Sequence, residues 1–448
     1  MRKLFGTDGI RAVAGKPPLD AKTIYAIGLA LAHSLKNGEA PRVVLGMDTR
    51  ESSTWIAAAI TAGLKDGGAT VENAGVITTP AIAFLTAKHG FSAGIVISAS
   101  HNPWEDNGIK LFGPDGYKLA DAIELAIEEE IFKHLETAQA PDLGTLAAPE
   151  VNEADRAEYI RFLLAAVPGL SLDGKKIVVD CANGAASSVA PQLFAELKGT
   201  VLITHASPDG RNINEHCGAL HADVVAAEVL KHKADLGITF DGDADRALFA
   251  DAEGNVVNGD AVVLLAARDL QARGLLAGDV VVTTTMSNMG LEAALKRSGI
   301  KMLRAPVGDK YVLEEMRKSK AALGGEQSGH ILFPALATTG DGLLTALLLL
   351  DLIHRSGKSL SELKSDLKVF PQVIVNVKVR EKKPLEEIPT IAATIRAAEA
   401  ELADSGRVVI RYSGTEALAR VMIEAESEEA MKRHANAIAD AIRAELGI

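Results

Sequence analysis

The sequence predicts an α/β protein with three tandem mixed-sheet α/β domains followed by a smaller α+β C-terminal domain. The chain has 448 residues, which is too long for a single hydrophobic core. Short apolar runs alternate with helical patterns from residue 20 to about residue 368, as in sheets with helices on their faces. From about residue 371, apolar and polar residues alternate as in a half-exposed antiparallel strand. We place the domains at 1–150, 151–255, 256–369 and 370–448.

The composition is that of an ordinary globular protein, with 48% hydrophobic and 24% charged residues. The net charge of −12 argues against nucleic-acid binding, because no excess of Lys and Arg is present to displace counterions. Cys181 and Cys217 are too few for a disulfide scaffold, which favours a cytoplasmic protein. Cys217 is interpreted as a structural thiol, with a nucleophile as the alternative. The apolar run 343–353 is too short to span a membrane and is predicted as a buried helix, and no signal peptide is recognised.

The elements of the first domain follow from local patterns. Residues 6–11 are predicted as a glycine-punctuated turn that carries Arg11. The elements predicted after this turn are a helix at about 20–36, a strand at 42–46, a helix from about 53, strands near 70–71 and at 94–97, and an acidic helix at 121–133.

The same alternation restarts in the second and third domains. Strands are predicted at 175–180 and 234–240, and then at 279–284. The fourth domain is predicted to contain a strand at 373–379, a helix at about 388–403, strands at 407–412 and 419–424, and a final helix.

A polar loop follows the predicted strand 94–97. Ser100 and His101 lie on this loop just before Asn102-Pro103, which stops both strand and helix, and Lys110 follows shortly after. In open α/β sheets such loops carry the chemistry. Taken alone, the pattern favours a simple turn whose Ser and Asn side chains bind local backbone groups.

An acidic loop follows the predicted strand 234–240. Asp241, Asp243 and Asp245 alternate there and are followed by Arg246, so that three carboxylates can face one hard cation. An EF-hand is excluded, because Arg246 replaces its glycine and Ala252 replaces its last glutamate. Mg²⁺ fits this set better, and the alternative is a solvated acidic turn.

Two further loops offer ligand contacts. The glycines of loop 324–330 allow close backbone approach, and Glu326, Ser328 and His330 can bind sugar hydroxyls, although a single histidine on a loop is commonly just solvated. The segment from Arg411 to Glu416, with Arg420 behind it, presents hydroxyls, backbone N–H groups and guanidinium groups suited to a phosphate.

These four motifs, in this order and spacing, resemble the α-D-phosphohexomutase superfamily. The resemblance covers essentially the whole chain, from Gly6-Thr7-Asp8-Gly9-Ile10-Arg11 to the Arg411 motif, and includes the stretches 285–288 and 339–342. The residues of the 326–330 loop and of the N-terminal motif resemble those of the glucosamine branch of this superfamily. The mannose/glucose branch is the alternative.

The resemblance implies roles for individual residues. Ser100 would be the phosphorylated serine and, with Asp241, Asp243 and Asp245, would hold one Mg²⁺ per subunit. The reacting phosphoryl group would be surrounded by Arg11, His101 and Lys110, with Lys110 or His330 transferring a proton. The sugar and the non-reacting phosphate would be bound by Glu326, Ser328, His330, Arg246, Arg411, Ser413, Gly414, Thr415 and Arg420.

The implied reaction converts glucosamine 6-phosphate to glucosamine 1-phosphate through a 1,6-bisphosphate, and it feeds the synthesis of cell-wall precursors. The enzyme would be activated by phosphorylation of Ser100, with glucosamine or glucose 1,6-bisphosphate as primer, and a fourth domain that moves would let one sugar bind in two orientations. A homodimer is left open. Four positions, Ala12, Lys310, Tyr412 and Ala417, depart from the family pattern. Lys310 keeps the charge of the usual arginine but loses its bidentate fork.

Other function classes stay open from the sequence. A Mg²⁺-dependent sugar phosphatase would use the same serine and aspartates and would release phosphate. A non-catalytic sugar-phosphate sensor is disfavoured, because Ser100, the three aspartates and Arg246 are all present. A Ser-His hydrolase is disfavoured because Ser100 lacks the flanking glycines of a nucleophile elbow.

Overall fold

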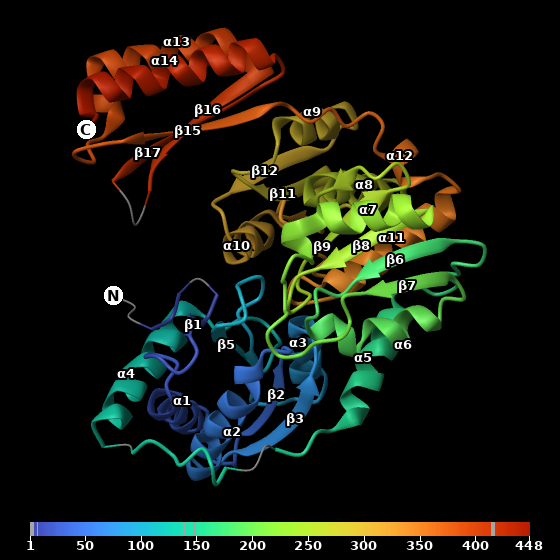
Figure 1. Cartoon of the computed structure of the whole chain (residues 1–448), viewed down its shortest axis with the longest axis vertical. Coiled ribbons are helices and arrows are strands. Elements are labelled where there is room, and N and C mark those ends of the chain that lie inside the picture. The colour runs from blue at the N-terminus through green and yellow to red at the C-terminus, as the bar shows by residue number, and fades with distance from the viewer. Residues whose placement is uncertain (1–3, 7, 138, 147–148, 414–416) are drawn as a thin grey trace. The chain divides into compact units, whose positions relative to one another are not determined.

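The structure is a computed structural model, which describes residues 4–6, 8–137, 139–146, 149–413 and 417–448 (Figure 1). The chain divides into two compact units. The first comprises Met1–Thr285 and Met302–Lys364, and the second comprises Met286–Lys301 and Ser365–Ile448. Three mixed or parallel sheets lie in the first unit and one antiparallel sheet lies in the second, which confirms the predicted fold class.

The first sheet has the strand order β1-β5-β4-β2-β3. Its strands are β1 (Ile10–Val13), β2 (Arg42–Met47), β3 (Thr70–Val76), β4 (Ala93–Ile97) and β5 (Asp106–Phe112). β2 runs parallel to β3 and β4, whereas β5 is antiparallel to both β4 and β1. One prediction is corrected here: Arg11 lies on strand β1 and not on a turn, because Ile10 and Arg11 pair with β5. Lys110 lies inside β5.

Helices cover both faces of this sheet (Figure 1). Alternate strand residues such as Val43 and Leu45 pack into the core formed with α1 (Ala21–Ser34), α2 (Glu51–Asp66) and α4 (Asp121–Thr137). α3 (Thr79–Lys88) covers the other face, where a Cβ atom at Gly46 would collide with Ile82. The side chain of Asp20 caps α1, in agreement with the predicted helix start.

The second sheet has the order β10-β9-β8-β6-β7. The strands are β6 (Lys176–Asp180), β7 (Thr200–Thr204), β8 (Leu236–Phe240), β9 (Ala247–Asp251) and β10 (Val256–Val257). β6 runs parallel to β7 and β8, so their carboxyl ends share one edge of the sheet. The helices are α5 (Glu153–Ala165), α6 (Ala190–Ala195) and α7 (Ala222–His232), with the 3₁₀ turns η1 (Ala185–Ser188) and η2 (Ala219–His221).

The third sheet has the order β12-β11-β13-β14. It consists of β11 (Val280–Thr284), β12 (Lys301–Ala305), β13 (Gly324–Gly325) and β14 (Ile331–Leu332). Its helices are α8 (Gly259–Ala272), α10 (Asp309–Ser319), α11 (Gly342–Ser356) and α12 (Leu360–Leu363), with the 3₁₀ turn η3 (Ala277–Asp279). The apolar run 343–353 lies within α11 and is largely buried, as predicted.

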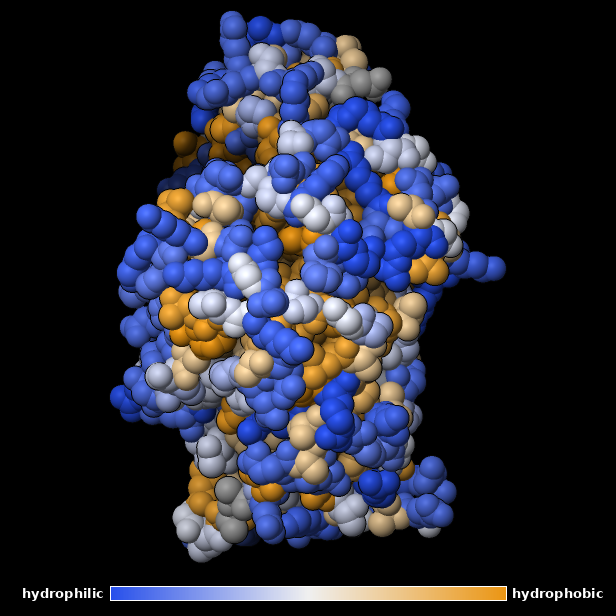
Figure 2. All heavy atoms as spheres, turned by 90° about the vertical axis from the view of Figure 1, so that its right-hand side faces the viewer, coloured by the Kyte–Doolittle hydropathy of each residue, from blue (hydrophilic) through white to orange (hydrophobic). Residues whose placement is uncertain are grey.

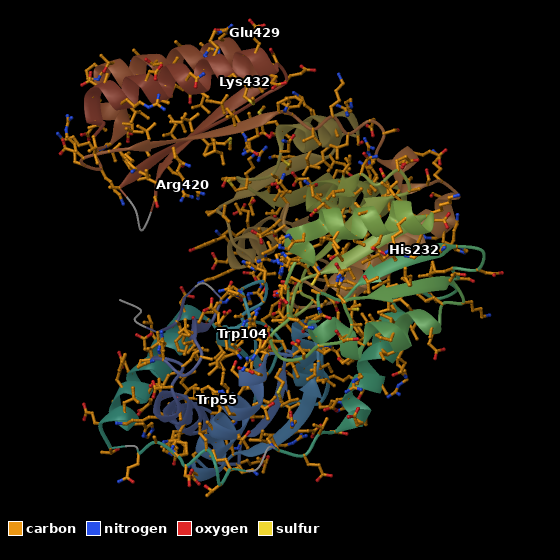
Figure 3. All side chains as sticks on the ribbon, in the orientation of Figure 1. Trp55, Trp104, His232, Arg420, Glu429 and Lys432 are labelled. Carbon is orange, nitrogen blue, oxygen red and sulfur yellow. The ribbon has the colours of Figure 1, made fainter. Side chains whose placement is uncertain are left out.

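The second unit contains an antiparallel sheet of order β15-β17-β16. Its strands are β15 (Gln372–Lys378), β16 (Gly406–Tyr412) and β17 (Leu418–Ala425). The helices of this unit are α9 (Met289–Arg297), α13 (Pro389–Leu402) and α14 (Glu428–Leu446). The 3₁₀ turns are η4 (Leu385–Glu387) and η5 (Ala403–Ser405). Apolar residues of α13 and α14 form a core with one face of the sheet. Figure 3 shows Glu429 and Lys432 on α14 and Arg420 on β17.

In the part of the chain that the structure describes, no helix combines the length and the apolar character needed to cross a bilayer. On the face shown in Figure 2, hydrophilic residues are interspersed with apolar ones.

Candidate active site

Ser100 lies on the loop that leaves β4, as predicted. Its backbone has a left-handed φ of 53°, and its side chain is buried with 1% exposure. The Oγ atom donates a hydrogen bond of 2.6 Å to Oδ2 of Asp241, which belongs to a different sheet. A turn whose serine only satisfies local backbone groups does not require this contact. The local role falls to Ser98, whose Oγ accepts a hydrogen bond from the Ser100 N–H at 2.9 Å.

The buried side chain of Arg50 supports the Ser100 loop. This residue was not identified from the sequence. Arg50 is 2% exposed, and its guanidinium donates to four carbonyl oxygens, those of Ser100, Asn102, Pro103 and Asp106. Asp48 balances its charge through an ion pair of 2.8 Å, and also accepts from Ser98 Oγ at 2.6 Å. Asn214 adds a donor to the carbonyl of Ser100 at 3.0 Å. These contacts fix the strained turn in one conformation.

Asp241, Asp243 and Asp245 lie on the loop between β8 and β9, and all three are buried. One carboxylate oxygen from each lies within 4.8 Å of the others. Among the described residues, Oδ1 of Asp243 and Oδ1 of Asp245 are buried without a hydrogen-bond partner. Buried acceptors of this kind are costly unless a ligand satisfies them, so the cluster fits a hard cation, and the alternative of a solvated turn is wrong.

The carboxylates of this cluster affect one another. Burial, followed by the negative charges of Asp245 and Asp243, raises the pKa of Asp241 well above its ordinary value. Burial also acts to raise the pKa of Asp245, but the nearby charges of Lys110, His330 and Arg246 hold it well below its ordinary value. A divalent cation would stabilise the charged form of all three carboxylates.

Three cationic groups surround the serine and the aspartates. Lys110 Nζ lies 2.7 Å from Asp243 Oδ2 and 3.5 Å from Asp245 Oδ2, and is fully buried. Arg246 Nε lies 3.6 Å from Asp245 Oδ1. Arg11 forms an ion pair with Asp8. A transferring phosphoryl group needs positive charge arranged in this way.

His101 and Lys110 differ in their readiness to exchange a proton. Nδ1 of His101 lies 3.4 Å from Ser100 Oγ, and burial together with Arg246 and Arg11 lowers its pKa. Burial would also lower the pKa of Lys110, but the carboxylates of Asp243, Asp8 and Asp245 hold it well above its ordinary value. His101 is therefore neutral near pH 7, whereas Lys110 keeps its charge.

A closed ring of charged and titratable side chains joins the first domain to the loop Glu326–His330. Lys110 pairs with Asp8 at 3.2 Å, and Lys118 pairs with Asp8 at 2.5 Å and with Asp309 at 2.6 Å. His330 closes the ring at 3.7 Å from both Asp309 and Asp245. Sequence reasoning missed Lys118 and Asp309, because residues 191 positions apart show no local signal of their contact.

The loop Glu326–His330 connects β13 to β14. The carboxylate of Glu326 accepts the Gly308 N–H at 3.1 Å, and the Ala247 N–H donates to the carbonyl of Gly329 at 3.1 Å, next to Arg246. Ser328 is half-buried. His330 is 2% exposed and accepts the Gly340 N–H at 3.2 Å, so the alternative of a solvated histidine is wrong.

The predicted phosphate-binding residues lie in the second unit. Arg411 on β16 and Arg420 on β17 are direct partners in the antiparallel register, so their side chains emerge on the same face of the sheet. Ser413 is 7% exposed and donates its N–H to the Leu418 carbonyl at 2.8 Å. Gly414 and Thr415, also predicted as ligands, lie outside the described residues.

The structure therefore brings together Ser100, the three aspartates and the cationic side chains around them in the first unit. The members of this group among the predicted site residues are Arg11, Ser100, His101, Lys110, Asp241, Asp243, Asp245, Arg246 and His330. The negative charge of Glu326 contributes to the raised pKa of Arg246, so Glu326 is also a member of this group. Arg411, Ser413 and Arg420 form a second group in the other unit.

Comparison with known proteins agrees with this arrangement. The domain I, II, III and C-terminal models of the phosphoglucomutase/phosphomannomutase family match residues 2–138, 157–254, 258–370 and 374–441. The phosphoglucosamine mutase of Koribacter versatilis is 60% identical over 100% of this chain and 98% of its own length.

Two solved structures show the same fold. A phosphoglucomutase/phosphomannomutase family protein from Burkholderia thailandensis is 24% identical, with a TM-score of 0.79 over 99% of both chains. The Aspergillus fumigatus N-acetylphosphoglucosamine mutase, solved with GlcNAc-6P and magnesium, is 20% identical, with a TM-score of 0.62 over 98% of this chain and 96% of its own. The chain thus belongs to the phosphoglucomutase/phosphomannomutase family and, within it, to the phosphoglucosamine mutases, which are isomerases.

Proposed function

We propose that the enzyme interconverts glucosamine 6-phosphate and glucosamine 1-phosphate through a phosphorylated Ser100. The observation that carries this proposal is the buried Ser100 Oγ, 2.6 Å from Asp241 and enclosed by cations from separate domains. The high identity to a phosphoglucosamine mutase supports the choice of sugar. Glucose and mannose phosphates stay as alternative substrates.

Asp241, Asp243 and Asp245 would hold one Mg²⁺ per subunit, with the Ser100 phosphate as a further ligand. The unsatisfied oxygens of Asp243 and Asp245 support this assignment, as does the magnesium in the fungal N-acetylphosphoglucosamine mutase structure. When bound, Mg²⁺ supplies positive charge that neutralises the oxygens of the transferring phosphoryl group.

In the first half-reaction, the sugar C1 hydroxyl attacks the phosphorus of phosphorylated Ser100. A bond from this hydroxyl oxygen to phosphorus forms, and the bond from Ser100 Oγ to phosphorus breaks. The product is glucosamine 1,6-bisphosphate. Neutral His101, 3.4 Å from Ser100 Oγ, is the group that we assign to accept the hydroxyl proton. It takes this role in place of Lys110 or His330, the groups expected from the sequence, because their surroundings raise the pKa of both. Lys110 and Arg246 keep their charges and stabilise the transferring group.

In the second half-reaction, Ser100 Oγ attacks the phosphorus at C6, so the bond from the C6 oxygen to phosphorus breaks. The proton held by His101 passes to the C6 oxygen, and glucosamine 1-phosphate leaves the phosphorylated enzyme. The bisphosphate must present its two ends in turn. Glu326, Ser328 and His330 would bind the sugar in both orientations, and the Arg411 loop, including Ser413, Gly414, Thr415 and Arg420, would bind the other phosphate.

The cycle begins only from phosphorylated enzyme, because unmodified Ser100 has no group to donate. Activation therefore requires phosphorylation of Ser100, for which glucosamine or glucose 1,6-bisphosphate would serve as primer. The buried, cation-lined position of Ser100 supports its modification by a small phosphate donor. A homodimer and a cytoplasmic location stay predictions.

The test is an assay of the purified protein with Mg²⁺, glucosamine 6-phosphate and a trace of hexose bisphosphate, in which glucosamine 1-phosphate and free phosphate are both measured. We expect isomer formation without phosphate release, and a preference for glucosamine over glucose and mannose phosphates. Faster turnover of another sugar would contradict the substrate assignment. Phosphate release without isomer would indicate a sugar phosphatase and overturn the mechanism.

A further inference from the structure

A second cluster of metal-ligating side chains lies at the carboxyl edge of the second sheet. Asp180 ends β6, His205 follows β7 directly, and Cys217 lies on the loop that leads to η2. One ligand atom from each of these residues lies within 4.8 Å of the other two. None of the three takes part in the proposed mechanism.

We propose that Asp180, His205 and Cys217 form a structural binding site for a Zn²⁺-type transition-metal ion. A carboxylate, an imidazole and a thiol are the ligand types that Zn²⁺ accepts in proteins. Mg²⁺ strongly prefers oxygen ligands, so the all-oxygen set of Asp241, Asp243 and Asp245 and this mixed set select different cations. The fourth position of a tetrahedral ion would be taken by water.

Backbone hydrogen bonds hold the Asp180 carboxylate in one orientation, as is typical of carboxylates that bind a metal. Its Oδ1 accepts the Ala182 N–H at 2.8 Å and its Oδ2 accepts the Gly218 N–H at 3.0 Å. Each oxygen has a second lone pair for a cation, and such backbone hydrogen bonds fix the direction in which the carboxylate points. The residue is completely buried, so its negative charge needs a positive partner.

His205 and Cys217 supply the other two ligands. Nδ1 of His205 lies 3.1 Å from Asp180 Oδ1, but makes no hydrogen bond of ordinary geometry to any described residue. The His205 side chain is 32% exposed, which gives an ion a path from solvent. The Cys217 thiol is buried, and burial with the charges of Asp180 and Glu215 raises its pKa to about 12.

Charge balance explains how a metal would bind. Without a metal, the His205 imidazole faces the Asp180 carboxylate at 3.1 Å. A proton on the Cys217 thiol or on the ligating nitrogen of His205 has to leave before an ion binds. A divalent ion between the three residues would displace these protons, which leave to solvent, and would stabilise the thiolate. The Asp180 carboxylate and the Cys217 thiolate would then together balance the two positive charges of the ion.

The site would join the loops that support Ser100. The Asn183 N–H donates to the His205 carbonyl at 2.6 Å, and the Asn214 N–H donates to the Ala182 carbonyl at 2.9 Å. The side chain of Asn214 in turn donates to the Ser100 carbonyl at 3.0 Å. The ion would therefore stabilise the scaffold behind the serine without touching the substrate.

The experiment uses Co²⁺ as a spectroscopic probe on full-length protein that has been stripped with a chelator and returned to buffer with Mg²⁺. We expect one Co²⁺ per chain with a thiolate-to-cobalt charge-transfer absorption in the near ultraviolet. Zn²⁺ should abolish this absorption and raise the melting temperature. Co²⁺ at the aspartate cluster gives no such absorption, because that cluster has no sulfur ligand.

Two variants test the ligand assignment. Cys217→Ser should lose the charge-transfer absorption, whereas Cys181→Ser, which removes the neighbouring buried thiol, should keep it. Cadmium NMR of the unmutated protein gives a second measurement that does not depend on whether Cys217→Ser folds, and we expect one resonance with the shift of a single thiolate ligand. Absence of the absorption in the unmutated protein, its survival in Cys217→Ser, or a cadmium resonance without a sulfur ligand would overturn the proposal. Mutase activity with Mg²⁺ tests the proposed function separately.

Discussion

The loop that carries Ser100 and the loop that follows Arg411 are both predicted to handle a phosphate, yet they are built in opposite ways. Ser100 is 1% exposed, and its loop carbonyls are bound by the buried Arg50. Arg411 is exposed and lies opposite a second cation, Arg420, across two antiparallel strands. The first loop is fixed by the protein interior, whereas the second presents positive charge at the surface of its unit.

This difference follows from what each loop has to do. A serine that makes and breaks a bond to phosphorus must be placed to within a fraction of an ångström, which a buried hydrogen-bond network achieves. A loop that binds the non-reacting phosphate has to accept either end of the bisphosphate in turn. Two arginines on the same face of a sheet offer positive charge that can bind either phosphate without enclosing it in the protein interior.

Ser100→Ala tests the Ser100 loop with the largest expected effect. The variant has no atom that can carry the phosphoryl group, so mutase activity should fall by about 10⁴-fold or more. The measurement is glucosamine 1-phosphate formation in the presence of hexose bisphosphate. Ser34→Ala is the matched control, because the Ser34 hydroxyl bonds only to the Ala30 carbonyl of its own helix. Retention of substantial activity by Ser100→Ala would remove Ser100 from the mechanism.

Arg50→Lys should disturb the same loop through its support. Lysine keeps the charge but cannot donate to four carbonyl oxygens from one planar group. We expect a loss of about 2–4 kcal/mol in the free energy of unfolding, measured with urea, because buried carbonyls lose their donors. We also expect a lower kcat with little change in KM. Unchanged stability and kcat would show that the Ser100 turn needs no such support.

Arg411→Lys makes the same substitution in the other loop and should give the opposite result. Arg411 is exposed, so the free energy of unfolding should change by less than about 0.5 kcal/mol. KM for glucosamine 6-phosphate should rise about tenfold, because the bidentate contact to phosphate is lost. A fall in stability as large as that of Arg50→Lys would contradict the distinction between the two loops.

Asp341→Asn tests the free-energy cost of burying the carboxylate that caps α11. Burial raises the pKa of Asp341 to about 6, against hydrogen bonds from Leu344 and Tyr159 that act to lower it. Because the folded form holds a proton that the unfolded chain has released, this group destabilises the fold increasingly as the pH rises from about 4 to 6. Asparagine still caps α11 and carries no charge. We expect Asp341→Asn to be more stable by about 1–3 kcal/mol at pH 8, with the gain vanishing near pH 4. An equal effect at both pH values in urea unfolding would contradict the assigned cause.

Tyr412→Phe should give the smallest effect. The Tyr412 hydroxyl donates to the Lys383 carbonyl at 2.6 Å, and Lys382 Nζ donates to the Ser413 carbonyl at 2.6 Å. Both hydrogen bonds connect the end of β16, where the predicted phosphate loop begins, to the segment after β15. Loss of one such bond is worth about 1 kcal/mol, so KM should rise about two- to fivefold while kcat is kept. An unchanged KM would show that the departure at position 412 has no role in positioning the loop.

The sequence was sufficient for the fold class, and it identified Ser100 and the three aspartates, which the structure places close together. Ser100 and the aspartates each follow an apolar strand, and such local patterns are readable in one chain. Arg50, Lys118 and Asp309 were not predicted, because their roles arise from contacts between segments far apart in the sequence. The turn predicted at residues 6–11 extends into the start of strand β1, because the four residues of β1 gain strand geometry only by pairing with β5.

The central claim is that the phosphoryl group of the product passes through Ser100. The direct measurement starts from enzyme carrying labelled phosphate on Ser100 and mixes it with unlabelled glucosamine 6-phosphate in a single turnover. The account predicts that label leaves the protein at the rate of turnover and appears in glucosamine 1,6-bisphosphate and glucosamine 1-phosphate. Label that stays on the protein while glucosamine 1-phosphate forms would contradict it, and label released as free phosphate would indicate hydrolysis.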